Sequence, residues 1–93
     1  MTPSEPVRVP LGRTVATPAA LGTLSQADLV TALCRHAAGD WGECCLEDQE
    51  TNAAALREAL PLFSVYRSAA GVRFWVITEA DRSVTTVLLP KEY

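Results

Sequence analysis

Polar and apolar positions are patterned most clearly in the last third of the chain. Residues 62–68, 72–78 and 83–89 are rich in β-branched and aromatic side chains, and short turn-forming segments separate them. This pattern predicts a C-terminal three-stranded antiparallel β-meander.

The central strand of this meander has apolar side chains on both faces. Val72, Phe74 and Val76 alternate onto one face, whereas Trp75 and Ile77 fall on the other. We therefore expect helices to cover one face. The N-terminal segment or a second subunit should meet the other.

Helical signals precede the meander. Thr17 followed by Pro18 supplies a capping hydroxyl and a first-turn proline, which predicts a short helix. Ser25, with Asp28 three residues later, forms a capping-box pattern before a helix over residues 26–38.

A third helix is predicted over residues 47–59. Glu47 and Asp48 suit its N-terminus because carboxylates interact favourably with the helix dipole. Its buried side is expected to carry Ala53, Leu56 and Leu60.

The chain of 93 residues is expected to form one α+β domain over residues 11–93, with two to three helices packed on the meander. Three prolines in residues 1–10 predict an extended tail. Residues 11–16 are compatible with a short extra N-terminal strand.

Composition and charge argue against two classes of protein, those that bind nucleic acid and those that span a membrane. The net charge is −3 and Lys91 is the one lysine, so direct binding of nucleic acid is not expected. The chain has no apolar run of the ~20 residues that a membrane helix needs and no signal-peptide pattern, so a cytoplasmic location is expected. No cofactor is predicted, and a homodimer is compatible with the pattern.

The most distinctive loop spans residues 39–42, where two glycines flank an acid and a tryptophan. Gly39 is expected to end the preceding helix, and both glycines are expected to adopt positive φ. Five acids and no base lie between residues 40 and 50. We interpret this segment as an acidic surface centred on an exposed tryptophan that binds a protein partner. The predicted binding residues are Asp40, Trp41, Glu47, Asp48, Glu50 and Asn52. The alternative is structural: the acids cap the helix, Trp41 joins the core and Asn52 bonds to the 39–42 loop.

The sequence gives no compelling catalytic or metal site. The spacing of Cys34, His36, Cys44 and Cys45 does not suit tetrahedral zinc, so no metal is predicted and Cys44 and Cys45 should be dispensable. His36 is expected on the exposed side of its helix, and Arg82 is expected to pair with Glu79. If the protein is an enzyme, five side chains would have to converge: His36, Asp40, Tyr66, Arg67 and Arg82.

Several short motifs carry a resemblance. They are GDWG at 39–42, Asp48 with Asn52, Ser64 with Tyr66, and WVITEADRSVTTVLLP at 75–90 followed by Glu92 and Tyr93. The chain resembles a group of small uncharacterised bacterial proteins carried on plasmids, phages and integrated elements. The resemblance implies a mobile-element or defence-associated setting, but it implies no mechanism.

A weaker resemblance links the chain to RelE/ParE-type toxins, which also place helices before an antiparallel meander. Its motif would comprise Tyr66-Arg67 and Asp81-Arg82, with Val84 and Val87. Two functions are thus expected as alternatives. The first is protein binding, as an inhibitor or regulator in restriction, CRISPR or toxin–antitoxin pathways. The second is a divergent toxin or small nuclease.

Overall fold

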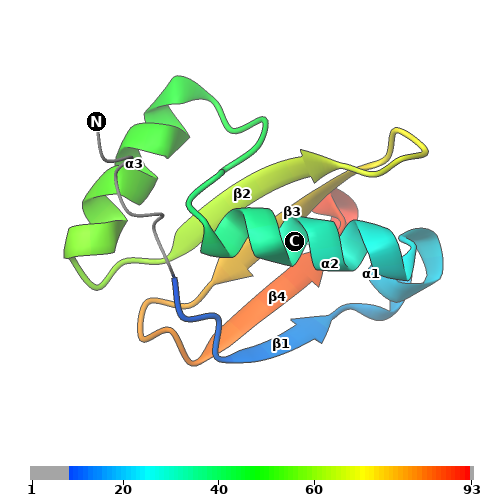
Figure 1. Ribbon diagram of the computed structural model, residues 1–93, viewed down its shortest axis with the longest axis horizontal. Coiled ribbons are helices and arrows are strands. Elements are labelled where there is room, and N and C mark those ends of the chain that lie inside the picture. Colours follow the sequence, from blue (N-terminus) through cyan, green and yellow to red (C-terminus); the bar gives the residue numbers. More distant parts are fainter. Residues whose placement is uncertain (1–8, 93) are drawn as a thin grey trace, which may run out of the picture.

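The computed structural model describes residues 9–92, which form an α+β fold (Figure 1). In chain order, its elements are β1 (Arg13–Ala16), α1 (Pro18–Thr23), α2 (Gln26–Ala37), α3 (Leu46–Arg57), β2 (Leu62–Arg67), β3 (Arg73–Thr78), β4 (Val84–Leu88) and the 3₁₀ turn η1 (Pro90–Glu92). The predicted α+β class is confirmed. The tail predicted for residues 1–10 lies largely outside the described residues.

The sheet is four-stranded and mixed, with strand order β1-β4-β3-β2. The pairs β2–β3 and β3–β4 are antiparallel, whereas β1 pairs with β4 in parallel, with Thr14 beside Thr85. A three-stranded antiparallel meander alone is therefore the wrong description. β1 and β4 thus run in the same direction, although α1, α2, α3, β2 and β3 lie between them in the chain.

Local sequence chemistry explains both helix starts. Thr17 Oγ1 accepts the Ala20 N–H at 3.2 Å, and Pro18 is the first residue of α1. Ser25 and Asp28 bond reciprocally to each other's backbone N–H, which completes the predicted capping box. Gly39 follows the end of α2 with φ +80°, as the sequence predicted for a helix-ending glycine.

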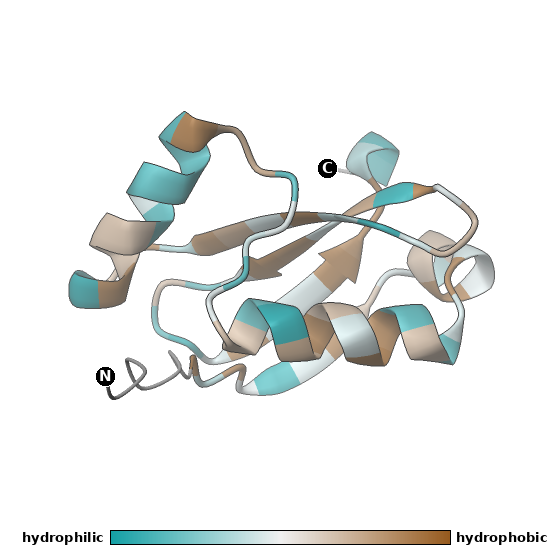
Figure 2. Ribbon diagram, turned by 45° about the horizontal axis from the view of Figure 1, so that its top comes forward, coloured by the Kyte–Doolittle hydropathy of each residue, from teal (hydrophilic) through white to brown (hydrophobic). Residues whose placement is uncertain are grey.

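The main core lies between α1, α2 and one face of the sheet (Figure 2). Phe74 and Val76 of β3 are 1% and 0% exposed, whereas Trp75 and Ile77 on the opposite face are partly exposed. This alternation confirms the predicted assignment of the two faces.

A smaller core joins α3 to the rest of the molecule. It contains Val9, Ala55 and Leu62, and Trp41 packs against it. α3 buries Asn52 and Ala55, whereas Ala53, Leu56 and Leu60 are exposed. The prediction that these three residues form the buried side of the helix is therefore wrong.

No helix in residues 9–92 combines the length and apolar character that crossing a membrane requires.

Candidate functional site

The five side chains that an enzyme would need do not line one cleft. His36 is 0% exposed beneath the sheet, and Arg82 is bonded to backbone at the end of α3. Tyr66 and Arg67 share a separate cavity, and the Asp40 carboxylate is paired with Arg35. This arrangement brings no acid, base or nucleophile together over an open site.

His36 is the centre of a buried polar network, not the exposed side chain that the sequence predicted. Its Nδ1 lies 2.5 Å from Ser64 Oγ, and its Nε2 lies 2.8 Å from Thr78 Oγ1. Thr78 Oγ1 lies 2.7 Å from Thr85 Oγ1, which donates to Leu11 O at 2.7 Å.

The hydrogen bond from Thr85 to Leu11 O determines which atoms donate in the rest of the network. Because Thr85 gives its proton to a carbonyl, it accepts from Thr78, which in turn accepts from His36 Nε2. His36 is therefore the neutral Nε2–H tautomer, and its Nδ1 accepts from Ser64. The network aligns α2 over three strands and leaves no group free for catalysis.

The sequence contains a signal for this network. His36 follows Ala32 by four residues, on the buried side of α2, and its hydroxyl partners all occupy inward positions of their strands. An apolar helix face that ends in a histidine opposite inward-facing hydroxyl residues indicates a buried network.

We expect the network to make stability depend on pH. Burial, with a smaller effect of Arg82, lowers the pKa of His36 to about 4, against ~6.5 in the unfolded chain. Between these values the unfolded state binds a proton that the folded state does not. The free energy of unfolding should therefore fall as pH drops, by about 2 kcal/mol between pH 7 and pH 5.

Chemical denaturation at the two pH values, with NMR titration of the imidazole, measures this effect. An imidazole that titrates near pH 6.5 in the folded protein would contradict the buried network.

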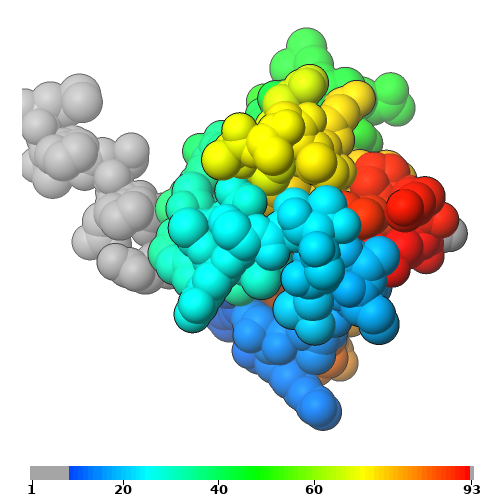
Figure 3. Space-filling model, turned by 90° about the vertical axis from the view of Figure 1, so that its right-hand side faces the viewer, coloured from blue at the N-terminus to red at the C-terminus, as the bar shows by residue number. Residues whose placement is uncertain are grey.

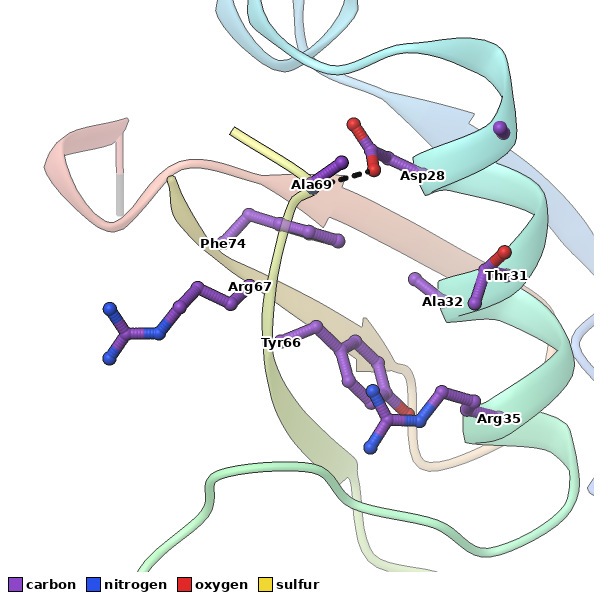
Figure 4. A pocket seen from close by; sticks show the side chains of 9 residues that line it. Asp28, Thr31, Ala32, Arg35, Tyr66, Arg67, Ala69 and Phe74 are labelled. Carbon is purple, nitrogen blue, oxygen red and sulfur yellow. Dashed lines mark hydrogen bonds between the residues drawn. The ribbon is translucent and has the colours of Figure 1, made fainter. Parts of the chain in front are cut away.

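A cleft beside α2 has an aromatic floor. A cavity of about 350 Å³ lies between α2 and the β2–β3 hairpin (Figure 4). Tyr66 and Phe74 line its floor, Asp28 and Arg35 border it from α2, and the Arg67 side chain extends away from α2. Burial raises the pKa of Tyr66 to about 12, and its hydroxyl donates to Asp40 O. Tyr66 is therefore a structural hydroxyl at neutral pH.

The charged groups around this cleft already have protein partners. Arg35 lies 4.7 Å from the Tyr66 ring centroid and donates to both Asp40 carboxylate oxygens. Arg67 binds Glu43 in the same way, and Asp28 accepts from Ala69 N–H. These hydrogen bonds hold the pKa values of Asp40 and Glu43 below their usual values. The predicted acidic surface is thus partly neutralised by arginines from other elements.

The predicted binding residues separate into two groups. Trp41 is only partly exposed and meets His36 edge-on at 5.5 Å between ring centroids, and Asn52 is 1% exposed. The Asn52 side chain is therefore closed to a partner, whereas part of the Trp41 ring remains accessible. Glu47 and Glu50 remain exposed on α3, whereas Asp48 is half-buried.

Asn52 instead completes the edge of the sheet. Its side-chain amide donates to Phe63 O at 2.6 Å and accepts from Phe63 N–H at 3.0 Å. Next to it, Val65 N–H donates to Trp41 O, and Val65 O accepts from Glu43 N–H. The loop and α3 therefore bond the outer edge of β2 as a further strand would. The alternative prediction, that Asn52 bonds to the 39–42 loop, is therefore also wrong.

Arg82 has a similar structural role. It adopts φ +62°, and its guanidinium donates to the carbonyl oxygens of Ala55, Leu60 and Glu79 at 2.8, 2.7 and 3.1 Å. The expected pairing with the Glu79 carboxylate is therefore replaced by a bond to the Glu79 backbone. Arg82 ties the end of α3 to the β3–β4 turn.

The three cysteines differ in their exposure to solvent. Cys34 and Cys45 are exposed, whereas Cys44 is 6% exposed and donates to Phe63 O at 3.2 Å. Burial raises the pKa of Cys44 to about 11, so its thiol is protonated and poorly nucleophilic. Within residues 9–92, no three His, Cys, Asp or Glu side chains are grouped so that they could hold a metal ion.

Cys45→Ser should stabilise the protein. Cys45 is the N-cap of α3 and makes no side-chain capping bond, although its backbone is already extended at φ −66° and ψ 162°. A serine hydroxyl can accept a free N–H of the first turn, which is worth about 0.5–1 kcal/mol. Thermal and urea unfolding would measure the gain. Cys34→Ser, on the exposed side of α2, is the control, and an equal gain there would rule out capping as the cause.

No family model, curated protein or solved structure matches this chain.

Proposed function

We propose that the protein acts by binding another protein, and that α3 carries the binding surface. The observation behind this proposal is the orientation of α3. The helix packs on β2 through the amide of Asn52 and the small side chain of Ala55, while Leu46 and Leu56 are 71% and 42% exposed. The exposed parts of these two leucine side chains do not contribute to the core. Large exposed apolar surfaces mark interaction sites.

The exposed surface extends beyond the helix. Leu60 is 40% exposed, and the next residue, Pro61, lines a cavity of about 290 Å³ with Ile77 and Leu88 on the face of the sheet away from α1 and α2. The apolar surface thus runs from α3 towards that face. We call Leu46, Ala53, Leu56 and Leu60 the α3 leucine surface.

Charge identifies the kind of partner. Glu47 and Glu50 are exposed beside Leu46 on the first turns of α3, and neither forms an ion pair within the described residues. The matching partner presents apolar side chains bordered by lysine or arginine, because complementary charges speed encounter. The α3 leucine surface would then supply most of the holding energy.

The setting of this activity is part of the same proposal. The resemblance to proteins of plasmids, phages and integrated elements supports an inhibitor or regulator of a cytoplasmic bacterial defence pathway. The toxin or nuclease alternative gains no support from the geometry, because its five residues lie apart.

The test compares matched variants in capture from a bacterial host. The wild-type chain and the variants Leu46→Ser/Leu56→Ser and Val30→Ser would each be immobilised. Val30 is 53% exposed on α2 and controls for loss of an exposed apolar side chain elsewhere. We expect a protein that is retained by the wild type and by Val30→Ser, but not by the double variant. Its purified form must also rebind, and more weakly at higher salt. Equal retention by all three proteins would refute the α3 leucine surface.

A further inference from the structure

The two edges of the sheet differ. At the β2 edge, the outward backbone groups of Phe63 and Val65 are bonded by Asn52, Trp41 and Glu43. At the opposite edge, β1 is the last strand of the sheet formed by residues 9–92. Figure 3 shows β1 in dark blue at the margin of the molecule, next to α1.

The ladder between β1 and β4 determines which groups point outward. Arg13 N–H donates to Ser83 O, and Thr17 N–H donates to Val87 O. In a parallel ladder, alternate residues direct their backbone groups to the same side. Thr14 and Ala16 therefore direct their N–H and C=O groups away from the sheet, where no strand of the described chain lies.

An apolar groove runs beside this free edge. A cavity of about 200 Å³ lies between β1 and α2, lined by Val15, Leu21, Leu29 and Leu33. Leu21 is 59% exposed. A free strand edge beside an apolar groove is the arrangement that accepts an added strand.

We propose that the added strand is β1 of a second copy of this chain, in antiparallel orientation about a twofold axis at Val15. Thr14 of each copy then faces Ala16 of the other, so that their outward N–H and C=O groups bond reciprocally. The two Val15 side chains meet at the axis, and the grooves lined by Leu21 close against one another. The two sheets become one continuous sheet.

Charge complementarity favours a second copy over an unrelated strand. In this register Arg13 of one copy lies opposite Thr17 of the other, whose hydroxyl donates to Glu92 Oε1 at 2.5 Å. The Arg13 side chain forms no hydrogen bond or ion pair within residues 9–92. Each arginine would therefore meet a carboxylate of the other copy, twice across the axis.

The register is tested by oxidative cross-linking in a Cys34→Ser/Cys45→Ser background. Val15→Cys should form an intermolecular disulfide, because directly opposed residues of a non-hydrogen-bonded pair have Cα atoms ~4.5 Å apart, within disulfide range. Arg13→Cys should not, because the two copies of residue 13 would be separated by four positions, or ~14 Å. Equal cross-linking of both variants, or cross-linking of Arg13→Cys alone, would overturn the register.

Sedimentation equilibrium of the full chain tests the association and its charges. We expect Arg13→Glu to weaken the dimer at least tenfold, and Arg13→Glu/Glu92→Lys to recover most of that loss. Arg57→Glu, on α3, should leave the dimer unchanged. Melting curves would confirm that each variant is folded. A wild type that stays monomeric up to millimolar concentration, or a dimer that Arg13→Glu does not weaken, would refute the proposal. Monomers that take up only a foreign extended peptide at β1 would refute it as well.

Discussion

Gly42→Ala should destabilise the protein by about 3–5 kcal/mol, enough to leave little folded protein in a domain of this size. Gly42 has φ +69°, and a Cβ there would lie 2.0 Å from Val65 O and 2.6 Å from Tyr66 Cδ1. Both the positive φ and the backbone contact oppose any larger residue. The loop must pass this close because Trp41 and Glu43, on either side of Gly42, bond to Val65. Urea denaturation would measure the loss.

Substitutions at two other glycines separate the cost of positive φ from the cost of the close contact. Gly71 has φ +86° with open space around it, so Gly71→Ala should cost only the ~1–2 kcal/mol of a left-handed backbone. Gly22 lies inside α1 with nothing within 4 Å, and Gly22→Ala should stabilise by about 0.5–1 kcal/mol. If Gly42→Ala costs no more than Gly71→Ala, the close approach of the loop to β2 is wrong.

Asn52→Ala should lower the free energy of unfolding by about 2–4 kcal/mol. The substitution leaves the N–H of Phe63 without a partner and leaves its carbonyl oxygen only the weak bond from the Cys44 thiol. An unsatisfied buried group costs about 1–3 kcal/mol. Hydrogen exchange should also increase at Phe63 and along α3, because the helix loses its main polar attachment to β2.

Two further substitutions define the role of the amide. Asn52→Asp keeps an acceptor for Phe63 N–H but turns a negative charge towards Phe63 O, which raises the pKa of the introduced carboxyl. A protonated carboxyl can both donate and accept. The deficit against the wild type should therefore be large at pH 7 and shrink as pH falls towards 4. Thr51→Ala, exposed on the same helix, should change stability by less than about 0.5 kcal/mol. A pH-independent deficit for Asn52→Asp would contradict the paired hydrogen bonds.

Local signals predicted the helix starts and the strand faces. Thr17 with Pro18, and Ser25 with Asp28, are caps whose effect is confined to one turn, so neighbouring residues suffice to identify them. The alternation around Phe74 likewise depends only on the two-residue period of a strand. The positive φ of Gly39 and Gly42 followed from the same local reasoning.

The failures concern contacts between distant parts of the chain. The parallel pairing of β1 with β4 joins Thr14 to Thr85, and no local pattern encodes it. The orientation of α3 was missed because Asn52 bonds to an open strand edge, which outweighs the burial of Leu56. Likewise, the acids near residue 40 have no basic neighbour within residues 40–50 of the sequence, so the segment alone predicts that they are unpaired. In the structure, Arg35 and Arg67 reach them from other elements.

The direct test of the proposed function is calorimetric titration of the partner retained by α3 against purified variants. We predict that Leu46→Ser/Leu56→Ser raises Kd at least tenfold, since truncating a central apolar anchor costs ~2 kcal/mol or more. Val30→Ser should leave Kd within about twofold of the wild type, because a side chain outside the interface contributes little to affinity. Equal affinities for the wild type and the leucine variant would contradict binding through α3.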